Sequence, residues 1–430
     1  MKKTISLCVF FFAVILAFGE GGLCLDDCFN YQYPRQDLIK THGWGGVKAF
    51  EEQDEDGFIV EKRWPTVNLT LTPEEEKARF GTTGLVLAKK AYKIYHYDGT
   101  NMRMFVYATV CHRAGERKLI GWRGETNPAM PEEYLDPDYP EEKKEGEDWS
   151  IMIHWVDPSD IRGTGILIKS YNNKDKDHDT WIWFPSLRKT RRLTPSNGDD
   201  GVGGTDHTFS TGFLLRIKDE KQQIIGETRY SAYLPVDYYE GLYLLDKYGP
   251  ATKEYVEYYK KVIAQPRDCW VLRCKSVRGG YGDWYHTRIT FIDKELGCEY
   301  GYEMFTPKGR LMRTYWFTNR STSDFNGKPR LAWVNIMEVI NLQDRGYTYF
   351  VAPQTSFGCP VDESWFSLRE LKRSVPTVSI PYMTVLLPQN LAPLKELYPP
   401  EIIEARKEFF PERITSFPDA TGPVGIDKWR

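Results

Sequence analysis

Between Ser150 and Phe209 the chain alternates short apolar stretches with turn-forming and charged residues, a pattern that predicts antiparallel strands. A Pro/Asp/Gly turn and a charged turn separate three such stretches, which end in a doubly basic, glycine-rich loop. In the first stretch, Ser150–Val156, neither of the two alternating sets of side chains is uniformly polar. We therefore expect a sheet that is covered or that encloses something.

The third stretch, Thr180–Pro185, is unusually rich in aromatic residues. Trp181 and Trp183 fall on one face of the predicted strand, while Ile182 and Phe184 fall on the other. Its final proline lacks a backbone N–H and therefore ends the ladder of backbone hydrogen bonds between the strands. Two indoles two residues apart would form a wide, stiff apolar wall.

The flanking sequence predicts helices before this region and further strands after it. Thr72–Glu76 offers an N-cap, a proline at the first helical position and three carboxylates, so a helix begins there and continues through Leu85–Tyr92, with Gly81 and Gly84 able to divide it. From Asn101 the apolar residues alternate with a period of two, which predicts a strand. Further strands are predicted at Lys118–Trp122, Phe213–Lys218, Gln223–Tyr233, Cys269–Val277, His286–Asp293, Cys298–Thr306, Leu311–Thr318, Arg330–Asn341, Tyr347–Val351 and Val378–Leu387. Leu234–Pro266 and Pro399–Phe410 have helical character.

A set of short motifs follows the order and spacing of a known family. Asp157-Pro158 precedes Ile161–Thr164, the Trp-rich strand that runs into Phe184–Arg188, then Arg191–Leu193 and Gly203–Asp206. A second block combines Thr287–Lys294, Tyr302–Leu311 and Trp365–Leu371. From about Arg103 to Lys372 the chain resembles the outer-membrane lipoprotein-sorting family, the LolA-like proteins.

The resemblance implies a mainly β (α+β) fold, in which a large curved antiparallel sheet forms an incomplete barrel covered by helices. The expected organisation is a signal peptide at 1–19, an irregular N-terminal extension at 20–71, a LolA-like half-barrel domain at 72–375 with a helical insertion at about 234–266, and a C-terminal extension at 376–430. The chain is about twice the size of a simple carrier of this family, so the insertion and the tail could fill or reshape the cavity.

The same resemblance implies that acyl chains are held between the sheet and its covering helices. Apolar and aromatic strand residues suit such a concavity. The candidate cargo-binding residues are Phe105, Arg123, Trp155, Ile166, Ile168, Trp181 and Trp183. Among them Arg123 stands near the place where the carriers have a functional arginine. A register error of one residue would exchange the two faces of any of these strands.

The first 19 residues predict secretion. Lys2 and Lys3 precede an apolar run that ends in the small residues Ala17 and Gly19, as in a bacterial secretory signal peptide. Cleavage would remove two positive charges and change the formal net charge from −3 to −5. A chain with this negative charge lacks the excess of basic residues that is typical of nucleic-acid-binding proteins. We expect a periplasmic protein. The outer-membrane lipoprotein that Cys24 would permit is disfavoured, because Leu23 stands where lipoprotein signals have a small residue.

The chain has 8 cysteines, and an oxidising compartment would favour pairing some of them. Cys24 and Cys28 are close enough to bridge locally. Cys269, Cys274 and Cys298 fall in neighbouring predicted strands and could crosslink the sheet, although spacing leaves the connectivity open.

The candidate chemistry is sparse. The chain contains no G-x-S-x-G, H-E-x-x-H or P-loop motif. His154, Asp206 and His207 could form a metal-dependent hydrolytic site, but strand and loop histidines are usually structural. We expect no catalytic residues, metal or cofactor. The basic group Arg188, Lys189, Arg191 and Arg192 could contact an anionic lipid headgroup or a partner, or it could balance neighbouring acidic loops.

The function predicted from the sequence is that of a non-enzymatic periplasmic carrier for lipoproteins or other lipidic cargo, travelling to or from the outer membrane. Its implied partners are that cargo and an inner-membrane transporter of the resistance-nodulation-division type or an outer-membrane acceptor. Two alternatives stay open. One is a secreted metal-dependent hydrolase around His154, Asp206 and His207, and the other is a non-enzymatic outer-membrane assembly factor.

Overall fold

The computed structural model describes a large part of the chain between residues 71 and 373. The described residues are 71–95, 101–112, 115–127, 132–136, 146–171, 176–194, 198–211, 216–233, 264–277, 285–323, 329–344, 346–352, 355–357 and 363–373. The predicted signal peptide, the N-terminal extension to residue 70, the helical part of the insertion and the C-terminal extension lie outside them.

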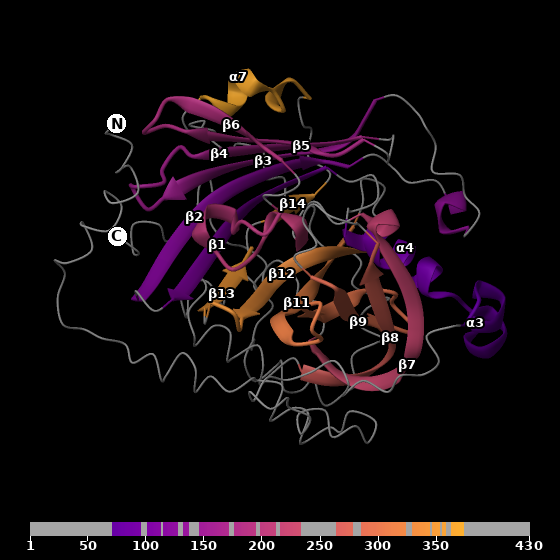
Figure 1. Cartoon of the computed structure of the whole chain (residues 1–430). Coiled ribbons are helices and arrows are strands. Elements are labelled where there is room, and N and C mark those ends of the chain that lie inside the picture. Colours follow the sequence, from indigo (N-terminus) through magenta and orange to yellow (C-terminus); the bar gives the residue numbers. More distant parts are fainter. Residues whose placement is uncertain are drawn as a thin grey trace, which may run out of the picture.

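The described strands form one antiparallel sheet (Figure 1). They are β1 (Met102–His112), β2 (Gly115–Thr126), β3 (Glu147–Asp157), β4 (Gly165–Tyr171), β5 (Asp179–Phe184), β6 (Lys189–Leu193), β7 (Glu220–Tyr233), β8 (Ala264–Ser276), β9 (Thr287–Asp293), β10 (Glu299–Phe305), β11 (Leu311–Ser323), β12 (Pro329–Asn341), β13 (Gly346–Val351) and β14 (Thr355–Phe357). Their order is β6-β5-β4-β3-β2-β1-β13-β12-β11-β10-β9-β8-β7, and β14 pairs with β1 beside this path. Since β6 and β7 are the two ends of the order, the sheet is curved but not closed. The predicted fold class is confirmed.

Two α-helices precede the sheet in the chain, as the sequence predicts. α3 (Pro73–Phe80) begins with a capping box, in which Thr72 Oγ1 accepts a hydrogen bond from the Glu75 backbone and Glu75 accepts one from the Thr72 backbone. It ends at Gly81, whose φ of 74° is the left-handed conformation that closes many helices. α4 (Gly84–Tyr95) follows at once. The remaining short helices are η2 (Glu132–Leu135), η4 (Val202–Gly204), η6 (Ile217–Asp219), η7 (Glu363–Trp365) and α7 (Leu368–Leu371).

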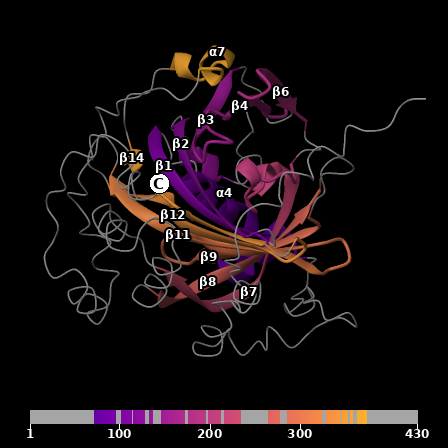
Figure 2. The ribbon, with the colours of Figure 1, turned by 90° about the vertical axis from the view of Figure 1, so that its left-hand side faces the viewer.

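The sheet curves around α4, which lies in its concavity in both ribbon views (Figure 2). The buried Glu76 carboxylate attaches this helix pair to β7 by accepting hydrogen bonds from the Gly84 backbone at 3.1 Å and the Ile224 backbone at 2.5 Å. Gly84 is needed at this contact, because a Cβ there would lie 2.8 Å from the Gln223 backbone nitrogen. Burial raises the pKa of the Glu76 carboxyl, and the two backbone hydrogen bonds oppose that rise.

Strands β1–β4 of the sheet are covered on both faces. Their inner face contributes to the main hydrophobic core, with Ile151, Ile153 and Trp155 of β3 all buried there. On the outer face, His154 contacts the Leu371 carbonyl of α7, and Trp122 lies against Trp365 of η7. The mixed apolar pattern of Ser150–Val156 therefore has the predicted cause, which is burial of both sides of the strand.

Three local predictions are wrong. The basic segment after Phe184 is not a loop, since it forms the edge strand β6 paired with β5. Ile217 and Lys218, the end of the predicted strand Phe213–Lys218, belong to the short 3-10 helix η6. Ala264–Pro266, expected at the end of the helical insertion, pairs with β7 as the start of β8, because ladder hydrogen bonding overrides weak local preference.

The cysteines of the sheet are also not crosslinked. Cys269, Cys274 and Cys298 are buried thiols that form no disulfide with one another. Desolvation raises the pKa of the Cys269, Cys274 and Cys298 thiols, and this keeps them protonated. They pack as small apolar residues in the described part of the sheet.

Candidate ligand cavity on the inner face

A cavity of about 560 Å³, taken to its open mouth, lies on the inner face of β1, β2, β3, β12 and β13. We call it the apolar cavity. Its lining residues are Met104, Val106, Gly121, Arg123, Ile153, Trp155, Val202, His207, Met337, Phe350 and Ala352. Apart from Arg123 and His207, these are aliphatic, aromatic or glycine residues, so the cavity favours an apolar occupant.

Strand register brings the lining residues together in rows across the sheet. Met104 of β1 lies opposite Arg123 of β2, which lies opposite Ile153 of β3. One step along, Gly121 lies opposite Trp155, and a Cβ on that glycine would come within 3.0 Å of the indole. The missing side chain therefore lets the Trp155 ring lie across β2.

Arg123 is held by a buried acidic neighbour. Its guanidinium donates a hydrogen bond to the carboxylate of Glu125, two residues further along the same face of β2. The two side chains are only 6% and 0% exposed. A buried ion pair of this kind is stable only while both partners are present. In the cavity wall, the positive charge of Arg123 is therefore balanced by the Glu125 carboxylate.

One segment covers the apolar cavity from inside the sheet. We call residues 198–211 the cover segment. Its Gly203 has a φ of 66° and lies so close to Trp155 that a Cβ would come within 2.4 Å of the ring. Val202 and His207 of the same segment line the cavity. The glycine-rich sequence is therefore required for close backbone contact with an indole, not for a phosphate.

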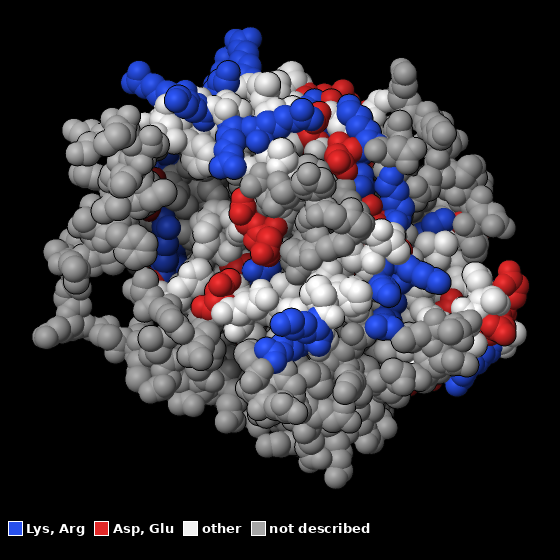
Figure 3. All heavy atoms as spheres, in the orientation of Figure 1, with Lys and Arg blue, Asp and Glu red and all other residues white. Residues whose placement is uncertain are grey.

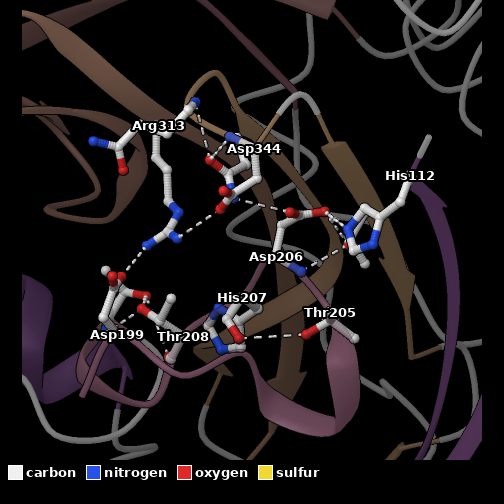
Figure 4. A network of polar contacts seen from close by, with 12 residues as sticks. His112, Asp199, Thr205, Asp206, His207, Thr208, Arg313 and Asp344 are labelled. Atoms are coloured by element: carbon white, nitrogen blue, oxygen red, sulfur yellow. Dashed lines mark hydrogen bonds and ion pairs between the residues drawn. The ribbon is translucent and has the colours of Figure 1, made fainter. Parts of the chain in front are cut away.

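Asp206 anchors the cover segment to three strands (Figure 4). Its buried carboxylate accepts hydrogen bonds from Asn341 of β12 at 3.1 Å, from Thr348 of β13 at 2.9 Å and from His112 of β1 at 3.0 Å. Its backbone N–H donates to the Thr348 hydroxyl at 3.0 Å. The hydrogen bond to Asp206 raises the pKa of His112. Asp206 therefore has a structural role in this network.

A second ion pair fixes the start of the cover segment. Arg313 of β11 is 5% exposed, and its Nη1 lies 2.7 Å from Asp199 Oδ1. Figure 4 shows Arg313 between Asp199 and the Asp344 turn. Burial, together with the positive charges of Arg123 and Arg313, lowers the pKa of His207 to about 3, so this imidazole is neutral at physiological pH.

The cargo-binding residues predicted from the sequence fall into three groups. Arg123 and Trp155 line the apolar cavity. Ile166 and Ile168 of β4 share its face and belong to the same core cluster, but they do not line it.

Phe105, Trp181 and Trp183 lie on the outer face. Trp181 is opposite Leu167 and Trp183 is opposite Gly165, where α7 approaches, while Ile182 packs against the inner core. The aromatic wall predicted for β5 therefore faces away from the cavity.

Sequence reasoning missed the cavity residues supplied by β1, β12 and β13. Met104, Val106, Met337, Phe350 and Ala352 come from strands distant in sequence that are adjacent only in the sheet. Alternation in β1 was a usable signal, because Met102, Met104, Val106 and Ala108 share one face. It could not show which face was internal.

The predicted hydrolytic group is not assembled. His154 lies on the outer face of β3 with its Nε2 3.4 Å from the Leu371 carbonyl, whereas Asp206 and His207 lie in the cover segment on the inner face. Burial lowers the pKa of His154. Within the described ranges no cluster of three or more His, Cys, Asp or Glu residues is arranged to hold a metal ion.

The predicted basic group lies at the edge of the sheet. Arg188, in the turn before β6, and Lys189, Arg191 and Arg192 of that strand are all exposed, and Arg192 pairs with Asp179. Lys and Arg side chains gather along the upper margin of Figure 3, where Figure 1 places α7 and β4–β6. Charged side chains on an edge strand oppose pairing with another chain. Contact with a headgroup or partner stays a prediction.

With the cavity and its cover described, the chain can be placed in a family. Residues 92–364, more than half of its length, match the family described as "Protein of unknown function (DUF1329)". The chain belongs to this family. None of the curated proteins compared with it matches in sequence.

Several solved structures are similar to the chain. A "putative outer membrane lipoprotein-sorting protein domain" from Vibrio parahaemolyticus is 15% identical with a TM-score of 0.49, and the match covers 67% of this chain and 98% of that one. A DUF1329 family protein from Desulfovibrio piger is 14% identical with a TM-score of 0.49, covering 70% and 100%. The LolA superfamily protein NE2245 from Nitrosomonas europaea is 13% identical with a TM-score of 0.41, covering 67% and 99%.

None of the helices formed by the described residues is long and apolar enough to cross a bilayer.

Proposed function

We propose that the protein is a non-enzymatic periplasmic carrier for lipoproteins or other lipidic molecules, and that the apolar part of the cargo occupies the apolar cavity. The observation that carries the proposal is this open cavity, which is lined almost wholly by apolar side chains on the concave face of an open sheet. Burying an alkyl chain there would gain about 0.8 kcal/mol for each CH₂ removed from water.

The construction of the cavity supports reversible binding. Met104 and Met337 contribute flexible, polarisable side chains to its wall, which can adapt to cargoes of different shape. The cover segment rests on Trp155 through Gly203 and is held by the hydrogen bonds of Asp206, while its Val202 and Phe209 pack in the main hydrophobic core. The ordered motifs between Ser150 and Phe209 and the N-terminal signal sequence add support for the carrier class and the compartment.

Within this proposal Arg123 and Trp155 bind cargo directly, together with Met104, Ile153 and Phe350. Ile166 and Ile168 support the inner core behind them. Exchange with an inner-membrane transporter or an outer-membrane acceptor would use the open mouth of the cavity. The basic residues of β6 are a candidate contact for either membrane-bound partner, because they are exposed and have one sign of charge.

The test is lipid extraction and mass spectrometry of protein purified from its own periplasm. We expect reproducible co-purifying acyl species in the wild-type protein. Val106→Trp should reduce them several-fold, because the indole would fill the cavity from β1. Trp181→Ala on the outer face is the matched control and should retain them. Wild-type protein that reproducibly carries no lipid, or a Val106→Trp variant as loaded as wild type, would contradict the proposal.

A further inference from the structure

A second cavity lies between α4 and the inner face of β7, β9 and β10. It has a volume of about 650 Å³, taken to its open mouth, and we call it the polar cavity. α4 leaves this space because it presents the small side chains Ala88 and Ala91 there, with Tyr92 and Tyr95 following on the same side. The space is therefore encoded in one helix, at residues that contribute little packing volume.

The floor of the polar cavity is a charged triad. Arg288 of β9 donates from Nε and Nη2 to Glu220 of β7 at 2.9 and 2.7 Å, and from Nη1 to Glu299 of β10 at 2.7 Å. Tyr285 also donates to Glu220, at 2.6 Å. The Thr290 hydroxyl donates to Glu299. Both carboxylates are thus positioned by hydrogen bonds from β9 and from Tyr285, which lies just before that strand.

The charge of the described lining is unbalanced. Two carboxylates face one guanidinium. The Nε, Nη1 and Nη2 groups of Arg288 all donate to oxygens of these carboxylates. The Glu220 side chain is 2% exposed, whereas that of Glu299 is 17% exposed, so Glu299 is the carboxylate that an occupant reaches. Burial raises the pKa of Glu299, while the Arg288 guanidinium and the Thr290 hydrogen bond lower it, so a cation beside this carboxylate would further favour its ionised form.

Aromatic rings in the same cavity favour the same kind of group. Tyr92, Tyr95 and Tyr302 line it, and the guanidinium of Arg288 already lies 5.1 Å from the Tyr302 ring centroid. Tyrosine faces attract ammonium groups through the ring quadrupole. The cavity therefore combines a carboxylate with an aromatic wall, which is the arrangement that suits an ammonium ion.

The polar and apolar cavities lie on the same concave face, on either side of Tyr315. The Tyr315 ring stacks on Tyr302 at 4.5 Å and contacts His207 at 5.9 Å, and its hydroxyl is 2.7 Å from that of Thr211. Tyr302 and Thr211 line the polar cavity, and His207 lines the apolar one. Tyr315 thus contacts residues of both linings, which places the two cavities next to each other on this face.

We propose that the polar cavity binds the ammonium group of an amine-bearing amphiphile beside Glu299, with the apolar part of the same molecule in the apolar cavity. This inference rests on the proposed carrier function and adds the chemical class of the cargo. Glu299 supplies the charge, the tyrosines supply the aromatic wall, and Arg288 keeps both carboxylates in place.

The experiment measures binding of three probes with one chain length to the full-length protein by titration calorimetry: decyltrimethylammonium, 1-decanol and decanoate. We expect the ammonium probe to bind at least tenfold more tightly than the alcohol, and decanoate no better than the alcohol. Glu299→Gln should reduce the ammonium preference to about one while leaving the affinity for decanol unchanged. Glu227→Gln removes the same charge from β7 at an exposed position paired with Lys294, so it should keep the preference.

The outcomes separate the two proposals. If decanol binds but the ammonium probe has no advantage in wild-type protein, or keeps it in Glu299→Gln, the amine inference is wrong and the carrier proposal stands. If none of the probes binds, the carrier proposal itself fails. Should circular dichroism show that Glu299→Gln is unfolded, Ala91→Leu provides the second variant. By narrowing the polar cavity, it should weaken ammonium binding at least several-fold without changing decanol binding, and unchanged ammonium binding would overturn the inference.

Discussion

Gly203 lies directly against the indole of Trp155, where a methyl group added to the glycine would come within 2.4 Å of Trp155 Cζ2. This contact joins the cover segment to the floor of the apolar cavity. Gly203 also has a φ of 66°, a backbone conformation that residues other than glycine adopt only with strain. The position is therefore restricted both by the backbone and by its neighbour.

Replacing Gly203 by alanine should lift the cover segment from Trp155. We expect a loss of about 1–3 kcal/mol in the free energy of unfolding, the usual range for overpacking a close contact. Urea denaturation followed by tryptophan fluorescence measures it. Gly204→Ala is the comparison, because Gly204 also has a positive φ, of 84°, yet a Cβ there meets nothing within 4 Å. Equal losses in the two variants would show that backbone strain, not contact with Trp155, sets the cost.

The buried pair Arg123–Glu125 gives a second prediction. Arg123→Met retains much of the side-chain volume but leaves the Glu125 carboxylate buried without this guanidinium, which should cost about 3–5 kcal/mol. The double variant Arg123→Met, Glu125→Gln should recover a large part of that loss, since no charge then remains at the pair. A double-mutant cycle from denaturant unfolding gives the coupling free energy. A value near zero would mean that the pair does not hold the wall of the apolar cavity.

Stability should fall in acid because of His207. Its pKa is about 3 in the folded protein and about 6.5 in an unfolded chain. Between these values the unfolded state binds a proton that the folded state does not. The contribution of this group to the unfolding free energy therefore falls as pH decreases below about 6.5, by about 1.4 kcal/mol per pH unit.

His207→Gln removes this titration. Between pH 4.5 and pH 6.5, the slope of the unfolding free energy against pH should then correspond to about one proton fewer taken up on unfolding than in the wild-type protein. If the two slopes coincide, His207 is protonated in the folded protein and the proposed burial of its imidazole is wrong.

His112 should act with the opposite sign. Because the hydrogen bond to Asp206 raises its pKa above that of the unfolded chain, its stabilising contribution is complete at low pH and is lost as pH rises through the raised pKa. His112→Gln should therefore destabilise the protein most below about pH 6.5, with a smaller difference from wild type in alkaline solution. The same unfolding series, extended to pH 9, measures this effect. A deficit that grows with pH would exclude the ion pair with Asp206.

The secondary structure was largely readable from the sequence, for local reasons. Thr72, Pro73 and Gly81 specify the start and end of α3 through hydrogen bonds and backbone conformations that need no tertiary contact. Period-two patterning similarly predicted the strand containing Trp155. The basic segment of β6 was misread as a loop because an exposed edge strand carries polar side chains and has no apolar pattern to reveal it.

The candidate site was only partly predictable. Of the candidate residues, Arg123 and Trp155 lie in the wall of the apolar cavity, whereas Trp181 and Trp183 lie on the outer face of the sheet. A strand with apolar residues on both faces has no internal signal that distinguishes inside from outside. Ile182 between the two indoles is the residue that turns inward.

The sequence by itself therefore determined the kinds of elements, the antiparallel β class and the family resemblance, because propensity, capping and alternation are local properties. Only the tertiary structure decided which strand faces enclose the apolar cavity, that Asp206 anchors a cover segment, and that Glu220, Arg288 and Glu299 meet beneath α4. These contacts join residues far apart in the chain, as in the hydrogen bond between Thr348 and Asp206, which are 142 positions apart. Such pairs become neighbours through strand order and register, which depend on how the whole sheet packs.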